Sequence, residues 1–125
     1  MTIVDSDILI WLLRGKVEVK DQFIKLNNES NGIVYITPIQ IAEIYCGIRE
    51  NELNSTMIFL ESFEVINIDS KIGQLAGNYM KQYQKSHELM MADALIAATC
   101  NVLGFSLWTL NKKHYPMINK KDFYV

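Results

Sequence analysis

Short apolar runs alternate along the chain with longer segments in which apolar side chains recur every three or four positions. The short runs are typical of buried strands and cover residues 2–4, 33–36, 64–68 and 105–110. The longer segments predict helices over residues 7–13, 17–30, 52–62, 70–85 and 89–103, and a further helix that starts at residue 38. Strands that alternate with helices predict an α/β fold of three layers, with a mainly parallel central sheet flanked by helices.

Local capping signals support several of these boundaries. Thr37 is a good N-cap, Pro38 suits the first helical position, and Gln40 completes a capping box. Asp69 is placed to cap the helix that starts at residue 70. Gly104 is placed to end the helix before the last strand.

Length and composition favour one domain. The chain has 125 residues, two prolines and no linker-like or repetitive stretch, so we expect residues 1–125 to form a single domain. Cys46 and Cys100 lie in apolar patterns without metal-ligand spacing and are predicted to be buried thiols in a reducing compartment. No secretion signal or membrane-spanning run is visible, so a cytoplasmic protein without a membrane partner is expected.

Three acidic residues stand alone in apolar segments: Asp5, Glu43 and Asp93. None has a Lys or Arg within four residues, and burying a carboxylate without a counter-charge is unfavourable. Each has an ordinary structural interpretation, because Asp5 can be a turn residue or N-cap, Glu43 can interact with a helix dipole, and Asp93 can cap a helix that begins near Ala94. Three isolated acids in such positions nevertheless predict a shared site.

The predicted topology brings these acids together. In open α/β sheets, ligands bind beyond the carboxyl ends of the strands. Asp5 follows the first strand, Glu43 lies on the helix after the second, and Thr109 and Asn111 follow the last. We therefore expect one acidic crevice, in which Ser6, Thr109 and Asn111 can orient ligands or water through hydrogen bonds.

Carboxylates that converge repel one another, and a divalent cation relieves that repulsion. Oxygen ligands without Cys or His select Mg²⁺ or Mn²⁺ over zinc or copper. Water bound to such an ion is more acidic, and the ion can neutralise charge that develops on a phosphodiester. The pattern predicts hydrolysis of a phosphate ester.

Positive charge is concentrated near the C-terminal end, although the formal net charge is only −2. Four lysines lie around His114 there: Lys112, Lys113, Lys120 and Lys121. Such a group can contact a phosphate backbone or simply be a solvated surface.

Four segments, taken in order, carry a resemblance to a known family. They are VDSDILI (4–10), AEIYCGI (42–48), DALIAAT (93–99) and WTLNKKHY (108–115). Together they extend over essentially the whole chain, which resembles the PIN-domain ribonucleases and, more narrowly, the VapC toxins of bacterial toxin–antitoxin pairs.

The resemblance implies a PIN-like fold and an endoribonuclease that depends on Mg²⁺ or Mn²⁺. Asp5, Glu43 and Asp93 match the family's acidic metal site, and Ser6 matches its small hydroxyl residue. Many members have a fourth acid where this chain has His114, so a second metal site is left open. His114 then has two candidate roles, proton transfer and contact with phosphate, while Asn111 is expected to hold a water or a ligand.

The resemblance also implies partners. A cognate VapB-type antitoxin is expected to insert an apolar, partly helical segment near the active site, and two copies of the toxin are expected to form a homodimer, alone or within a larger hetero-oligomer with antitoxin. Ile8, Trp11 and Leu12 can serve such contacts or belong to the core, and the core is the more usual place for such a stripe.

Two other functions fit parts of the sequence. Asp5-Ser6-Asp7 after an apolar strand also resembles the nucleophile motif of haloacid-dehalogenase-type phosphatases, with Thr109 as a partner residue and Asp5 as a covalent nucleophile. That interpretation lacks paired late acids and does not explain Glu43. The third alternative is a non-catalytic PIN-like binding module, for which clustered acids would have no purpose.

Overall fold

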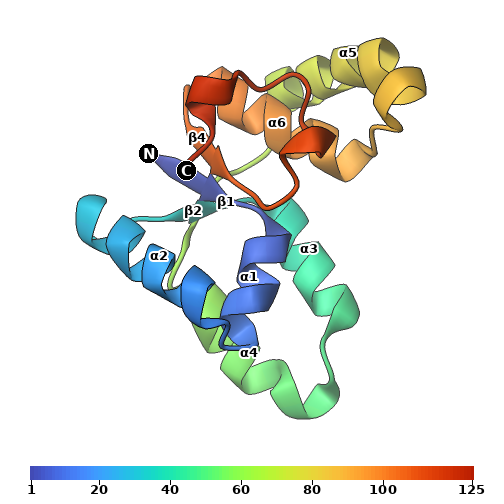
Figure 1. Cartoon of the computed structure of the whole chain (residues 1–125). Helices are drawn as coiled ribbons and strands as arrows, with labels where there is room; N and C mark the ends of the chain where they lie inside the picture. The colour runs from blue at the N-terminus through green and yellow to red at the C-terminus, as the bar shows by residue number, and fades with distance from the viewer.

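A computed structural model describes all 125 residues and consists of a parallel sheet with helices on both faces (Figure 1). The strands are β1 (Thr2–Val4), β2 (Tyr35–Ile36), β3 (Glu64–Val65) and β4 (Ser106–Trp108). Their order in the sheet is β3-β2-β1-β4, and every pair is parallel. The three-layer α/β fold predicted from the sequence is confirmed.

The helices follow the predicted segments closely. They are α1 (Ser6–Leu13), α2 (Val17–Glu29), α3 (Pro38–Gly47), α4 (Leu53–Glu61), α5 (Ser70–His87) and α6 (Met91–Leu103). The predicted caps are present, since Thr37 accepts a hydrogen bond from the Ile39 N–H, Asp69 accepts one from the Ile72 N–H, and Gly104 ends α6 with a φ of 70°. The first strand has the predicted bounds, whereas β2, β3 and β4 are shorter than predicted, because a strand extends only as far as its neighbours offer paired backbone.

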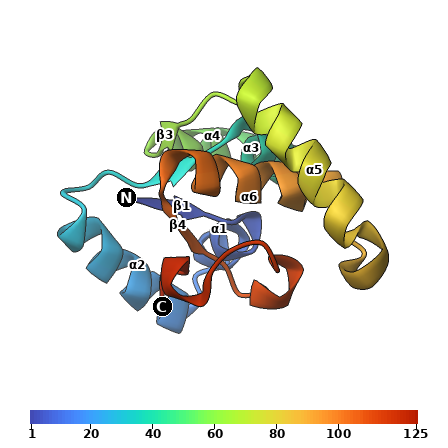
Figure 2. The same ribbon diagram turned by 90° about the horizontal axis from the view of Figure 1, so that it is seen from above.

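Alternate strand residues face the two helical layers. Val4, Ile36 and Trp108 belong to the core that α1, α2, α3 and α4 share with the sheet, whereas Ile3 and Leu107 belong to the core under α6. Figure 2 shows α5 lying against α6, on the side of the sheet away from α2. This period of two explains why neighbouring positions of β1 and β4 are both apolar, at Ile3-Val4 and at Leu107-Trp108.

The two cysteines differ in exposure. Cys100 is buried as predicted, but Cys46 is exposed near the end of α3, so the prediction of two buried thiols is wrong for Cys46. Cys46 lies on the solvent side of α3, whose buried side chains are Gln40 and Ile44. None of the six α-helices combines the length and the apolar character that crossing a bilayer requires.

Candidate active site

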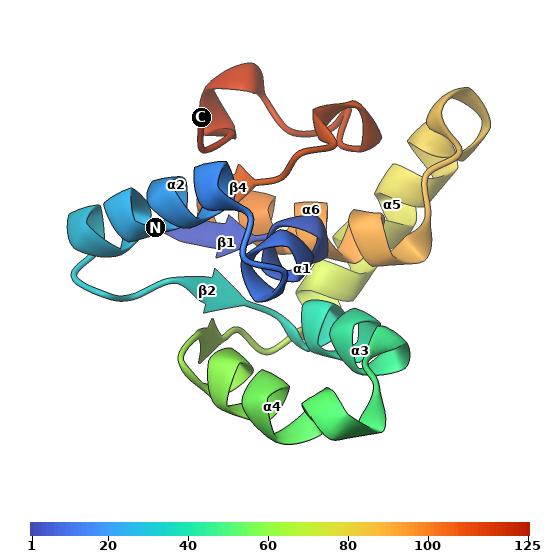
Figure 3. The same cartoon turned by 60° about the horizontal axis from the view of Figure 1, so that its bottom comes forward.

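The carboxyl ends of β1 and β2 point to one edge of the sheet, where α1 and α3 begin (Figure 3). Asp5 directly follows β1, and its backbone N–H donates to the Trp108 carbonyl at 2.9 Å, which continues the parallel pairing with β4. Asp5 is also the N-cap of α1, as one interpretation of the sequence predicted, and its Oδ1 accepts from the Ser6 N–H at 2.8 Å. Only 6% of Asp5 is exposed.

The second oxygen of Asp5 accepts hydrogen bonds from two hydroxyls. Thr109 Oγ1 and the Tyr115 hydroxyl each donate to Asp5 Oδ2 at 2.8 Å. The Tyr115 hydroxyl also lies 3.2 Å from Asp93 Oδ1. Tyr115 therefore links the acid at the end of β1 to the acid on α6.

Asp93 lies in the first turn of α6, which begins at Met91 with Met90 as its N-cap. The alternative in which Asp93 caps a helix that begins near Ala94 is therefore wrong, because the helix starts earlier and Asp93 is its third residue. His114 lies in the short 3-10 turn η2 (Lys112–His114), with its Nδ1 3.7 Å from Asp93 Oδ2. This contact is an ion pair only when His114 is protonated.

Glu43 lies in the second turn of α3, where its Oε1 accepts a hydrogen bond from Ser6 Oγ at 3.1 Å. Gln40, which the sequence predicted only as a capping residue, fixes the position of this helix. Gln40 is fully buried, and its Nε2 donates to the Val4 carbonyl at 2.9 Å, while its Oε1 accepts from the Thr37 N–H. The start of α3 is thus tied to the end of β1, which places Glu43 beside Ser6.

Asp7 is a fourth acid of this site, and it was not predicted from the sequence. Its Oδ2 accepts from the Leu110 N–H at 2.9 Å and from Asn111 Nδ2 at 3.0 Å, and Thr109 Oγ1 lies at 3.4 Å. Burial, together with the negative charge of Asp5, raises the pKa of Asp7 to about 6. The polar run Asp5-Ser6-Asp7 was the signal available in the sequence, since a helix turn after a strand can direct both acids to the same edge.

The carboxylates of this site lie close enough together for their charges to raise the pKa values of Glu43 and Asp93. The pKa of Glu43 is raised by desolvation of its carboxyl and, in smaller part, by the charges of Asp5, Asp93 and Asp7. The pKa of Asp93 is raised by burial and then by the charge of Asp5. No Lys or Arg forms an ion pair with any of these carboxylates, so their negative charge is opposed only by hydrogen-bond donors and by His114 beside Asp93.

The donor set fits a hard divalent cation in chemistry and in charge. Four carboxylates and several hydroxyls offer oxygen ligands, which are the ligands that Mg²⁺ and Mn²⁺ prefer. As the side chains stand, no three acidic, histidine or cysteine side chains form a group that would hold one ion. The Tyr115 hydroxyl contacts both Asp5 and Asp93, and the Ser6 hydroxyl contacts Glu43 alone. A third carboxylate must therefore move before three of them surround one ion.

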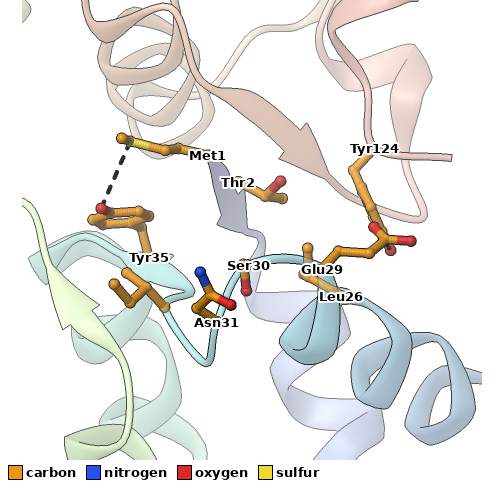
Figure 4. Close-up of a pocket in the computed structure, with 9 residues that line it drawn as sticks. Met1, Thr2, Leu26, Glu29, Ser30, Asn31, Tyr35 and Tyr124 are labelled. Carbon is orange, nitrogen blue, oxygen red and sulfur yellow. Dashed lines mark hydrogen bonds between the residues drawn. The ribbon is translucent and has the colours of Figure 1, made fainter.

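A second pocket of the molecule lacks the carboxylates that a site for hydrolysis would need. A pocket of about 410 Å³ lies at the amino ends of β1 and β2, with Met1, Thr2, Tyr35 and Tyr124 among its lining residues (Figure 4). Glu29 is the only carboxylate side chain in its lining. The acids predicted from the sequence all lie at the opposite ends of the strands.

The comparisons with known proteins agree with this architecture. The family model described as PIN domain matches residues 2–118. Ribonuclease VapC10 of Mycobacterium tuberculosis is 36% identical over 121 residues, which cover 96% of this chain and 90% of the relative. Ribonuclease VapC1 of Methanocaldococcus jannaschii is 32% identical over 120 residues, covering 94% of this chain and 81% of the relative.

A solved structure described as a toxin–antitoxin complex from Klebsiella pneumoniae superposes with a TM-score of 0.79 at 25% identity, covering 94% of this chain and 92% of that chain. The DNA-bound VapBC structure from Salmonella typhimurium has a TM-score of 0.76 at 21% identity and covers 94% of both chains, which shows the shared fold. By family model, sequence identity and fold, the chain belongs to the PIN-domain family and, within it, to the VapC ribonucleases.

Proposed function

We propose that this chain, a VapC ribonuclease and the toxin of a VapBC-type toxin–antitoxin pair, hydrolyses RNA phosphodiester bonds with Mg²⁺ or Mn²⁺ held by Asp5, Glu43 and Asp93. The observation that carries the metal assignment is the group of carboxylates at the carboxyl edge of the sheet, whose charge no Lys or Arg balances. Residues 1–125 act as one PIN domain in this proposal. Because its substrate is cellular RNA, the site of action is the cytoplasm.

A bound divalent ion supplies an acidified water as nucleophile and neutralises charge on the phosphodiester. Asp5, held by three hydrogen-bond donors, is the fixed ligand of the set. Glu43 and Asp93 are less buried and complete it from α3 and α6. Ser6 orients Glu43, and Thr109 and Asn111 hold Asp5 and Asp7 in place.

His114 is the one basic side chain in contact with the acids. Its side chain is 61% exposed, so a substrate phosphate can reach it. In its protonated form it contacts that phosphate or gives its proton to the leaving oxygen. The phosphatase alternative, in which Asp5 is a covalent nucleophile, is excluded by the family to which the chain belongs.

A groove beside Glu43 supports an antitoxin partner. It has a volume of about 500 Å³, its apolar lining comes from Ile10, Leu13, Ile44 and Ile48, and Glu43 forms part of its wall. An apolar segment of a VapB-type antitoxin lying there would cover the active site.

Pairing of two toxin copies as a homodimer is part of the same proposal. Light scattering of the purified toxin and of its antitoxin complex measures the number of toxin copies in each.

Cleavage of total cellular RNA by the purified protein tests the proposal. We expect discrete fragments with Mg²⁺ or Mn²⁺, none with EDTA, and a rate reduced by about 100-fold or more in Asp93→Asn, because a ligand charge is lost. Asp21→Asn, at an exposed position on α2, is the matched control and should cleave as the unchanged protein does. Turnover of p-nitrophenyl phosphate without RNA cleavage, or full activity of Asp93→Asn, would contradict the proposal.

A further inference from the structure

One buried hydroxyl lies between two acids that come from different elements. Tyr115 follows η2 and is 1% exposed, and its ring packs in the core under α6. Its hydroxyl lies 2.8 Å from Asp5 Oδ2 and 3.2 Å from Asp93 Oδ1. Both partners are carboxylate oxygens that the proposed function assigns to metal binding.

The two acids depend on this hydroxyl to different degrees. Asp5 has two other donors, the Ser6 N–H and Thr109 Oγ1, so its orientation is fixed without Tyr115. The Asp93 carboxylate accepts no other hydrogen bond, and its remaining contact is His114 at 3.7 Å. Tyr115 is therefore the main restraint on the Asp93 side chain.

A phenol has one proton to donate, so Tyr115 shares it between the two carboxylates or donates to one at a time. In either arrangement, the proton lies between two negative groups that would otherwise repel each other. The contact holds the acids at one separation before any cation arrives.

We propose that Tyr115 is a positioning residue that sets the separation of Asp5 and Asp93 for cation binding, a role that rests on the metal site of the proposed function. Tyr115 acts through Asp93, not on RNA. Hydrogen bonds that orient metal ligands commonly change metal affinity by about 10- to 100-fold when they are removed.

Tyr115→Phe separates this role from packing, because a phenylalanine ring fills the same space and lacks only the hydroxyl. The matched control is Tyr79→Phe, which removes a hydroxyl that accepts a hydrogen bond from Asn101 Nδ2 at 2.7 Å, outside the acidic edge. Mn²⁺ binding without RNA is measured by electron paramagnetic resonance for the two variants and the unchanged protein. We expect a dissociation constant about 10-fold or more higher for Tyr115→Phe and an unchanged value for Tyr79→Phe.

Equal Mn²⁺ affinity in Tyr115→Phe and the unchanged protein would overturn the role of Tyr115 and leave the proposed function intact. Absence of Mn²⁺ binding by the unchanged protein would overturn both.

A second measurement needs no metal: urea unfolding of Tyr115→Phe, Asp93→Asn and the double variant. Because the two residues form one contact, we expect the double variant's midpoint shift to differ from the sum of the single shifts, and additive shifts would overturn the inference.

Discussion

Asp5 and Asp7 are two positions apart and have different environments. Asp5 is the N-cap of α1, where its carboxylate accepts three hydrogen bonds in a buried setting. Asp7 lies in the first turn, half-buried, and reaches over to the chain segment that follows β4, where it meets Leu110 and Asn111. Burial and the charge of Asp5 raise the pKa of Asp7 to about 6, so this carboxyl titrates close to neutral pH.

Asp7 should make the stability of the metal-free protein depend on pH. Its pKa in the folded protein is raised, so its favourable contribution is complete below about pH 4 and is lost as pH rises through about 6. The rise from 3.8 to about 6 corresponds to roughly 3 kcal/mol in a fully buried site. Solvent screening at this half-buried group reduces the effect to about 1 kcal/mol.

Asn cannot titrate, so we expect Asp7→Asn to flatten the increase in the free energy of unfolding between pH 7 and pH 5 by about 1 kcal/mol. Its stability at pH 7 is not expected to rise, because an amide has one acceptor oxygen whereas both oxygens of Asp7 accept hydrogen bonds from N–H groups. Urea unfolding at both pH values in EDTA measures this. In this variant the free energy of unfolding still increases somewhat between pH 7 and pH 5, because the pKa values of Glu43 and Asp93 are raised as well. An Asp7→Asn variant with an unchanged pH profile would show that Asp7 does not carry the effect.

At the level of single residues, the isolation of Asp5, Glu43 and Asp93 in apolar sequence was sufficient to predict that the three acids lie together. The structure brings these acids to one edge together with Ser6, Thr109, Asn111 and His114. Their roles as ligands and supports stay predictions. Tyr115 and Gln40 were not predicted as parts of the site, because an aromatic ring or an amide in an apolar pattern indicates packing or capping, and its hydrogen-bond partner depends on tertiary structure.

Among the elements, α3 shows how a local signal produces a site. Thr37, Pro38 and Gln40 start the helix, and the Gln40 side chain also joins that start to the last residue of β1. Helix boundaries were predictable where such caps exist, because a cap is a local interaction. The lengths of β2 and β3 were not predictable, since each has only two residues and the extent of a strand depends on neighbours distant in sequence, although the bounds of β1 were predicted correctly.

Gln40→Ala should weaken both the fold and the site. Removing the buried amide leaves the Val4 carbonyl and the Thr37 N–H without partners, which costs about 2 kcal/mol of unfolding free energy. RNA cleavage should fall at temperatures where the variant is still folded, because Glu43 is no longer held beside Ser6. Urea unfolding and cleavage rates are compared with Gln82→Ala, at an exposed position on α5, and equal values for the two variants would contradict this account.

For the whole molecule, the parallel sheet concentrates acids at one edge, and the resulting repulsion is a destabilising feature of the metal-free protein. A cation that binds only the folded state should stabilise it, by about 2.7 kcal/mol at a concentration 100 times its dissociation constant. Thermal unfolding with Mn²⁺ or Mg²⁺, against NaCl of equal ionic strength, measures the shift. We expect a saturable increase in Tm that Asp93→Asn reduces, and an increase matched by NaCl would indicate screening alone.

The central claim is that the acidic edge formed by Asp5, Glu43 and Asp93 is a metal-dependent site for RNA hydrolysis. The most direct measurement is the cleavage rate of one RNA, chosen from the fragments that the protein produces, as a function of Mn²⁺ concentration. The account predicts a rate that saturates at the Mn²⁺ concentration where binding saturates and that falls at least about 100-fold in Asp93→Asn. Cleavage that persists in EDTA, or that Asp93→Asn leaves unchanged, would contradict it.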